Sequence, residues 1–133
     1  VKLADFGLSK EGVFDNYSAK TMCGTPEYLA PEVLEKQGGG RAADWYSLGI
    51  FVYEMATGNP PFHSDDRAEM YSQKRLGRLE FPDSVNGDMR EFIQALLRRV
   101  PEQRLGGGLR DGEDVRDHPF FAGLDWPAVE RRE

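Results

Sequence analysis

Glu54 is an acidic residue beside an apolar stretch, and it is the side chain whose surroundings most clearly require a partner. It directly follows the apolar run from Leu48 to Tyr53, within a segment that reads as a helix. A carboxylate in such surroundings is costly unless it is paired or hydrogen-bonded. The sequence therefore predicts a partner for Glu54, and an internal ion pair is one alternative.

Cysteine and histidine offer little further chemistry. The single cysteine, Cys23, excludes a disulfide framework and a cysteine-based zinc site. It is most simply a small packed residue, and a reducing compartment is expected. His63 and His118 have no companion residues that would complete a metal site, so both are expected to be structural.

The elements that position these residues are mainly helical. The segment from Asp5 to Thr25 lacks sustained periodicity and is polar, which indicates a long loop of functional or mobile character. The alternation from Val1 to Ala4 predicts a short strand before it. Apolar spacing, proline, glycine and capping signals predict helices over 31–36, about 43–57, from Ser64 or Asp66 to about 76, 88–100 and about 113–118. The helix over 43–57 is apolar on all sides, which is typical of the buried centre of a domain.

Length and charge narrow the classes of function. A chain of 133 residues fits one compact unit. Its net charge of −6 argues against nucleic-acid binding, which requires a basic surface. The longest apolar run is far too short to cross a bilayer, so no membrane span is expected.

Several short motifs occur in a fixed order along the chain, and the order matters because single short strings recur by chance. The motifs are Asp5-Phe6-Gly7, Gly24-Thr25-Pro26-Glu27-Tyr28, Ala30-Pro31-Glu32, Asp44-Trp45-Tyr46-Ser47-Leu48-Gly49, Pro60-Pro61-Phe62 and Pro101-Glu102-Gln103-Arg104-Leu105-Gly106. Together they resemble the protein kinases, from the activation segment onward. The stretch from Thr21 to Glu32 is similar to the AGC group, with the protein kinase B-like enzymes as the nearest likeness.

The resemblance implies a partial protein-kinase fold over 1–133. The fold class is mainly α: the C-terminal lobe of the catalytic domain, with an activation segment over 5–32. A helical part over 33–126 would surround a buried central helix.

The resemblance also implies how the chain would take part in phosphoryl transfer, which depends on positioning and on neutralising phosphate charge. Asp5 would hold the Mg²⁺ that accompanies ATP, although a solvated acidic residue is the alternative. Phe6 would be a packing plug and Gly7 a point of backbone freedom. Thr25 would contact the catalytic aspartate and help to select serine or threonine substrates.

Thr21 would be the phosphorylation site of the activation segment, modified by an upstream activating kinase. A phosphate adds up to about two negative charges and can order a loop against cations. Lys10 is the cation of this chain that the family places beside it. An unmodified surface threonine is the alternative.

The same resemblance implies a platform for peptides with basic residues upstream of the phosphoacceptor. Met22, Pro26 and Leu29 would line the pocket for the residue after the phosphoacceptor, or they are simply packing residues. Glu54 would bind an upstream arginine and Glu27 a more distant one. For both carboxylates an internal ion pair is the alternative.

Three residues would have architectural roles. Glu32 should form a largely buried ion pair with Arg104, which would tie the activation segment to the later helices. Asp44 resembles the aspartate that hydrogen-bonds the backbone of the catalytic loop.

The sequence contains no glycine-rich loop, strand lysine or His-Arg-Asp catalytic loop. The expectation is therefore an ATP- and magnesium-dependent serine/threonine kinase whose present piece is inactive by itself. It is expected to be intracellular, in the cytoplasm with the nucleus as an alternative. The other hypothesis is a pseudokinase-like module that binds substrates or regulators without catalysis.

Overall fold

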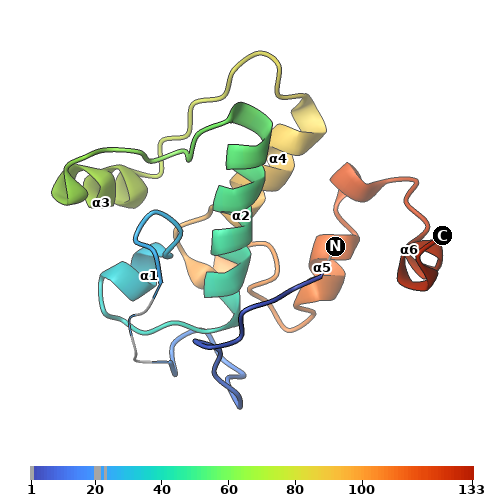
Figure 1. Ribbon diagram of the computed structural model, residues 1–133, viewed down its shortest axis with the longest axis horizontal. Helices are drawn as coiled ribbons and strands as arrows, with labels where there is room; N and C mark the ends of the chain where they lie inside the picture. Colours follow the sequence, from blue (N-terminus) through green and yellow to red (C-terminus); the bar gives the residue numbers. More distant parts are fainter. Residues whose placement is uncertain (1, 20–21, 23) are drawn as a thin grey trace.

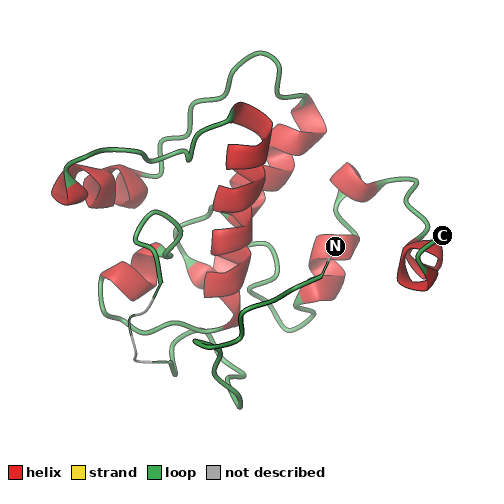
Figure 2. Cartoon of the chain, in the orientation of Figure 1, coloured by secondary structure: helices red, strands yellow, loops and turns green. Residues whose placement is uncertain are grey.

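The computed structural model describes residues 2–19, 22 and 24–133. Within these residues the regular structure is helical, and no strand occurs (Figures 1 and 2). The mainly α fold class is thus confirmed. The strand expected over Val1 to Ala4 is wrong for residues 2–4, which are extended and exposed. A strand requires a neighbour to pair with, and the described chain offers none beside this segment.

The helices follow the order that the sequence predicts, with different ends. Their bounds are α1 Pro31–Leu34, α2 Arg41–Thr57, α3 Arg67–Leu76, α4 Gly87–Leu96, α5 Gly112–Arg116 and α6 Trp126–Arg131, with 3-10 turns η1 Pro101–Gln103 and η2 Pro119–Phe121. Asp66 caps α3 by accepting a hydrogen bond from the Ala68 amide. Gly58 ends α2 in the left-handed conformation. Helix α6 is an element that the sequence analysis did not predict.

Helix α4 ends before the predicted residue 100 for a reason of tertiary structure. The carbonyls of Arg98 and Arg99 accept hydrogen bonds from the Arg104 side chain, at 2.9 and 3.1 Å. The carbonyl of Ala95 accepts one from the Leu105 amide. Because these bonds satisfy the backbone beyond the last helical turn, the chain leaves the helix at Leu96.

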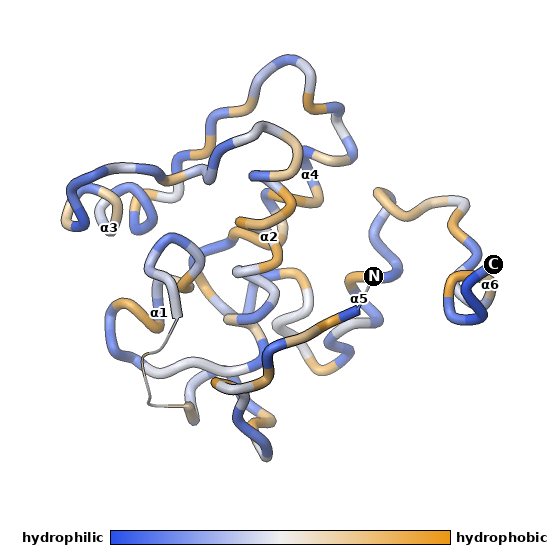
Figure 3. Tube along the Cα trace, in the orientation of Figure 1, coloured by the Kyte–Doolittle hydropathy of each residue, from blue (hydrophilic) through white to orange (hydrophobic). Residues whose placement is uncertain are grey.

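Helix α2 runs through the centre of the molecule and packs against α4 (Figure 1). Tyr46, Ile50 and Tyr53 of α2 are buried, together with Ile93 of α4 and Leu97 just beyond it. Apolar residues follow both helices (Figure 3). Helices α1 and α3 lie on one side of α2, and α5 and α6 on the other (Figure 1).

One side of α2 differs from the expectation of a fully buried helix. Phe51 is 49% exposed and Met55 is 66% exposed. Asp44 lies on the same helical face and is also exposed. The expectation is therefore wrong for this face, although α2 is the central helix.

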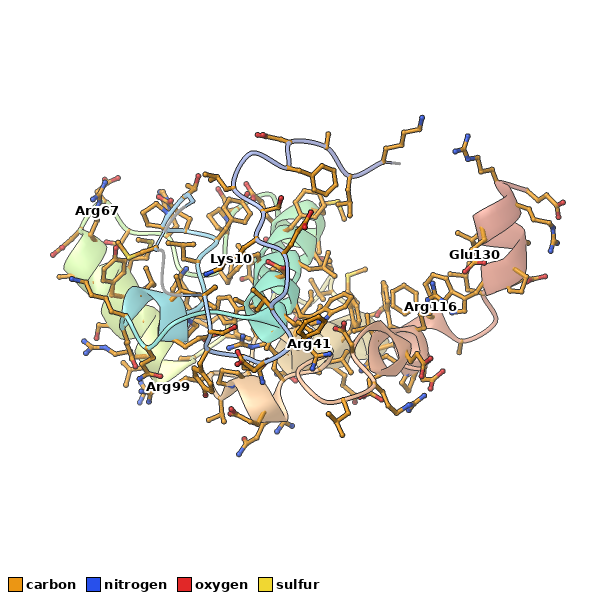
Figure 4. The ribbon with its side chains drawn as sticks, turned by 90° about the horizontal axis from the view of Figure 1, so that it is seen from below. Lys10, Arg41, Arg67, Arg99, Arg116 and Glu130 are labelled. Atoms are coloured by element: carbon orange, nitrogen blue, oxygen red, sulfur yellow. The ribbon has the colours of Figure 1, made fainter. Side chains whose placement is uncertain are left out.

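A second apolar cluster joins the C-terminal part of the chain to α4. Phe92 stacks on Phe120 with ring centroids 4.8 Å apart, and Phe121 packs edge-on against Trp126 at 5.1 Å. Arg116 of α5 pairs with Glu130 of α6 at 3.4 Å (Figure 4).

Among the described residues, no helix combines the length and apolar character needed to cross a bilayer.

The long polar loop is held against the start of α2. Ala19 and Gly39 exchange two backbone hydrogen bonds of 2.9 and 2.7 Å. Asp15 passes so close to Gly40 that a Cβ on Gly40 would lie 1.9 Å from the Asp15 carbonyl oxygen. Glycine at position 40 therefore allows the loop to pack on the helix.

Replacing Gly40 with alanine is expected to detach residues 15–19 from α2. The added methyl group would displace backbone atoms, and such overpacking costs about 1–3 kcal/mol. Amide hydrogen exchange in the natural protein should show faster exchange at Ala19 and Gly39. Gly87→Ala is the matched control, because nothing lies within 4 Å of its Cβ position. Unchanged exchange at Ala19 would contradict this account.

Candidate functional site

A cavity of about 550 Å³ brings together residues from the loop and from the start of α2. Asp5, Phe6, Lys10, Thr25 and Asp44 all line it. Asp5 is exposed and has a φ of 63°, a left-handed conformation that is uncommon outside glycine. Carboxylate, hydroxyl and ammonium groups thus meet around one cavity.

Asp44 is a carboxylate of this cavity whose pKa is affected by its surroundings. Desolvation by the protein raises the pKa of Asp44, and the negative charge of Asp111 raises it further. No cluster of three or more His, Cys, Asp or Glu side chains that could hold a metal ion occurs in the described part of the chain. A single carboxylate such as Asp5 still suits Mg²⁺ bound to a nucleotide, because phosphates and waters fill the other positions.

Thr21 and Lys10 are the residues predicted to form the phosphorylation site and its cation. Thr21 lies outside the described residues, so the structure does not relate it to Lys10. Lys10 is exposed. Gly7 adjoins the Asp5 side chain, since a Cβ on Gly7 would lie 3.5 Å from Asp5 Oδ1.

The segment 25–29 forms a hydrogen-bonded turn beside the cavity. The Tyr28 amide donates to the Thr25 carbonyl at 3.0 Å, and the Leu29 amide to the Pro26 carbonyl at 3.3 Å. Pro26 and Leu29 are half-buried, whereas Met22 is exposed. The structure thus brings Pro26 and Leu29 together in this turn. Met22, which is close to them in sequence, is exposed and lies outside the turn.

Glu54 has a partner that the sequence analysis did not name. Its carboxylate accepts a short hydrogen bond from the Tyr28 hydroxyl, and this bond raises the pKa of Tyr28. Within the described chain Glu54 has no ion pair, so its negative charge has no balancing cation there. The tyrosine satisfies the carboxylate without neutralising it.

Glu27 lies in the same turn and is half-buried. Its negative charge raises the pKa of Tyr28 and acts in the same direction on Lys74. Burial is the larger influence on Lys74 and lowers its pKa to about 8. Glu27 and Glu54 thus place two acidic groups around Tyr28.

Glu32 and Arg104 form the most enclosed ion pair of the described chain. Arg104 donates to both carboxylate oxygens of Glu32, at 2.7 and 3.0 Å, and the two side chains are 0% and 2% exposed. Arg104 also donates to the Ala42 carbonyl at 2.7 Å. The pair therefore joins α1 to the start of α2 and to the segment after α4.

Sequence reasoning missed two residues of this region, Tyr28 and Lys74. Tyr28 stands inside a quoted motif, but its hydroxyl partner is distant in sequence. Lys74 follows the buried Met70 by one helical turn, so the i, i+4 spacing alone could have placed it on the inner face of α3.

Comparison with known protein families identifies the class of this fold. A family model described as "Protein kinase domain" matches residues 1–121. The chain therefore belongs to the protein kinase domain family.

Several serine/threonine kinases are similar to this chain. It is 44% identical over 129 residues to a RAC-beta serine/threonine-protein kinase of Rattus norvegicus, covering 97% of this chain and 27% of the relative. It is 43% identical over 132 residues to RAC-beta serine/threonine-protein kinase A of Xenopus laevis, covering 99% and 27%. It is also 43% identical over 129 residues to the RAC-beta kinase of Homo sapiens, covering 97% and 27%. These results confirm the resemblance to AGC kinases of the protein kinase B-like type, and the chain spans 27% of these relatives' length.

Proposed function

We propose that this chain is the activation segment and peptide-binding part of an AGC-type serine/threonine kinase. The natural protein would transfer the γ-phosphoryl group of ATP to serine or threonine in basic peptides. The observation that carries the proposal is the shared cavity of Asp5, Thr25 and Asp44. It gathers a carboxylate suited to Mg²⁺, a hydroxyl and a second carboxylate where the reacting groups would meet.

The cavity residues have distinct tasks in this proposal. Asp5 holds Mg²⁺, which when bound neutralises charge on the phosphates of ATP. Gly7 gives the backbone beside Asp5 its freedom to move, and Thr25 contacts the catalytic aspartate. The expectation that Phe6 is a packing plug is not met in this chain, where Phe6 is 66% exposed. Asp44 orients the backbone of the catalytic loop by hydrogen bonding to it.

The proposed peptide platform consists of the turn 25–29, Met22 and Glu54. Glu54 binds an arginine upstream of the phosphoacceptor, supported by its unneutralised charge beside Tyr28. Glu27 binds a more distant basic residue. Met22, Pro26 and Leu29 receive the residue after the phosphoacceptor, and a hydrophobic side chain is favoured there.

The organisation and regulation of the chain complete the proposal. Residues 5–32 act as the activation segment and 33–126 as the helical lobe. An upstream kinase phosphorylates Thr21, and Lys10 contacts the phosphate. The natural protein acts inside the cell, in the cytoplasm or the nucleus, and the present chain by itself is inactive.

Replacing Glu54 with glutamine tests the peptide platform. Glutamine can still accept from Tyr28 but lacks the charge that an arginine requires. A charge-assisted hydrogen bond contributes about 1.5–3 kcal/mol, so the KM of the natural protein for an arginine-containing peptide should rise about tenfold to a hundredfold. The turnover number should change little, because the bond is made equally before and during the reaction.

Two controls sharpen this test. A peptide with alanine in place of the upstream arginine should show the same KM for both proteins. Glu91→Gln removes an exposed charge on α4 and should leave both peptides unaffected. An unchanged KM for the arginine peptide would remove Glu54 from the binding site.

The alternative function is a pseudokinase-like module that binds substrates or regulators without catalysis. The same acidic platform is compatible with this function, because it would bind basic peptides in either case. Peptide pulldown and ATP turnover, measured on the same preparation of the natural protein, separate the two functions. Binding with no turnover supports the module, and binding with turnover supports the kinase.

A further inference from the structure

Lys74 is a buried lysine in the last turn of α3. The residue is 1% exposed, a burial that lysine almost never has unless its ammonium is paired. Its ammonium nitrogen donates to the carbonyls of Pro26 at 2.8 Å, Glu27 at 2.7 Å and Leu29 at 2.8 Å. The three bonds use all three N–H donors of the ammonium group.

These bonds are the link between α3 and the turn 25–29. Among the hydrogen bonds of the described residues, the carbonyls of Glu27 and Leu29 accept from Lys74 alone. The ammonium also lies 5.7 Å from the centre of the Tyr46 ring in the core. Lys74 thus connects the turn 25–29 at the surface to the buried core around Tyr46.

The charge state of Lys74 is consistent with this arrangement. With a pKa of about 8, the amine is mostly protonated at neutral pH and keeps three donors. No carboxylate pairs directly with it in the described chain. Backbone carbonyls therefore take the place of a counter-ion, and the ammonium group holds these carbonyls in fixed positions.

A cavity lies beside Lys74. It measures about 330 Å³ and is lined by Pro31, Ala68, Tyr71, Lys74 and Arg75, among others. Without the ammonium group, the carbonyls of Pro26, Glu27 and Leu29 would lose the donors that now bind them. The turn would then no longer be fixed in one conformation.

We propose that Lys74 is a positioning residue for substrate recognition, which fixes the turn 26–29 so that it can select the residue after the phosphoacceptor. The inference rests on the proposed function, because that function assigns Pro26 and Leu29 to the pocket for this residue. Lys74 contacts no substrate itself. It acts through the backbone of the turn, whose Tyr28 also holds Glu54.

The test compares Lys74→Met with Arg75→Met in the natural protein. Both variants remove one positive charge from the same helix, but Arg75 is exposed. Two serine peptides that differ only in leucine or glycine after the serine serve as substrates. A hydrophobic pocket discriminates by roughly 10–200-fold, and Lys74→Met should lower the ratio of kcat/KM between the two peptides by about tenfold. Arg75→Met should keep the wild-type ratio.

Amide hydrogen exchange provides a readout that does not require activity. Lys74→Met should speed exchange at Tyr28 and Leu29, while exchange at buried Phe92 and Ile93 in α4 stays as in the wild type. If the wild-type protein transfers no phosphate, the proposed function fails, and the exchange result alone decides whether Lys74 holds the turn. Unchanged exchange at Tyr28 and Leu29, or an unchanged peptide ratio in an active variant, overturns the proposal.

A second variant covers the case in which Lys74→Met does not fold. Lys74→Gln keeps two N–H donors in a neutral side chain, so part of the anchoring should survive. Its ratio of kcat/KM between the leucine and glycine peptides should lie between the wild-type ratio and a ratio of one. Amide exchange at Leu29 should be faster than in the wild type. Wild-type behaviour of Lys74→Gln in both measurements also overturns the proposal.

Discussion

Replacing Arg104 with methionine is expected to lower the free energy of unfolding by about 3–5 kcal/mol. The change would leave the Glu32 carboxylate buried without its cation, and breaking a buried pair in this way has a cost of that size. It would also leave the carbonyls of Ala42, Arg98 and Arg99 without the donors that now satisfy them. Denaturant titration of the natural protein should show a much lower midpoint.

Arg99→Met is the matched control for this prediction. Arg99 pairs with Glu35 at 3.4 Å, but its side chain is 55% exposed, and exposed pairs contribute about 0–1 kcal/mol. The control should therefore lie close to the wild type. An Arg104 variant as stable as the Arg99 variant would show that the enclosed pair does not hold α1 to the later helices.

Replacing Asp5 with asparagine is expected to lower the turnover number of the natural protein at least about a hundredfold. Removing one preorganised electrostatic group from an active site commonly costs about 10²–10³ in rate. Asparagine has nearly the same shape but no charge with which to hold Mg²⁺. Peptide affinity should be unchanged, because the peptide platform that we propose lies around Glu54 and the turn 25–29.

Steady-state kinetics with an arginine-containing peptide checks this prediction. Asp65→Asn is the control, since Asp65 is an exposed acid in the loop before α3, and its turnover should equal that of the wild type. If the Asp5 variant needs a higher Mg²⁺ concentration than the wild type to reach half of its maximal rate, Asp5 has a role in metal binding. Full turnover by that variant would exclude Asp5 as the metal ligand.

Periodicity and capping signals predicted the elements that depend on local sequence. The amphipathic spacing around Phe92 and Ile93 placed α4, and Asp66 marked the start of α3. Gly58 ended α2 as expected, because only a left-handed residue closes the helix there. These signals work because the residues that decide the outcome lie within a turn or two of one another.

Features set by distant contacts could not be predicted in the same way. Helix α4 ends early because the Arg104 side chain accounts for the carbonyls of Arg98 and Arg99. The exposure of Phe51 and Met55 depends on which elements cover α2, and no local pattern contains that information. An apolar side chain reads the same in a sequence whether or not a neighbour covers it.

The candidate site shows the same division. The ordered motifs identified the residues around Asp5 and the ion pair of Glu32 with Arg104. They did not reveal the Tyr28 hydroxyl as the partner of Glu54, nor the three carbonyls that receive Lys74. Those partners are more than twenty residues away in the chain. The spacing from Met70 could place Lys74 on the inner face of α3, but it could not identify the carbonyls that the ammonium contacts.

The most direct measurement is phosphate transfer from ATP to a serine peptide by the natural protein, with Thr21 phosphorylated and the peptide analysed by mass spectrometry. The peptide carries arginine before the serine and leucine after it. We expect magnesium-dependent phosphate on that serine, and much less on a peptide in which alanine replaces the arginine. A protein that binds the peptide tightly but never transfers phosphate to it would contradict the account.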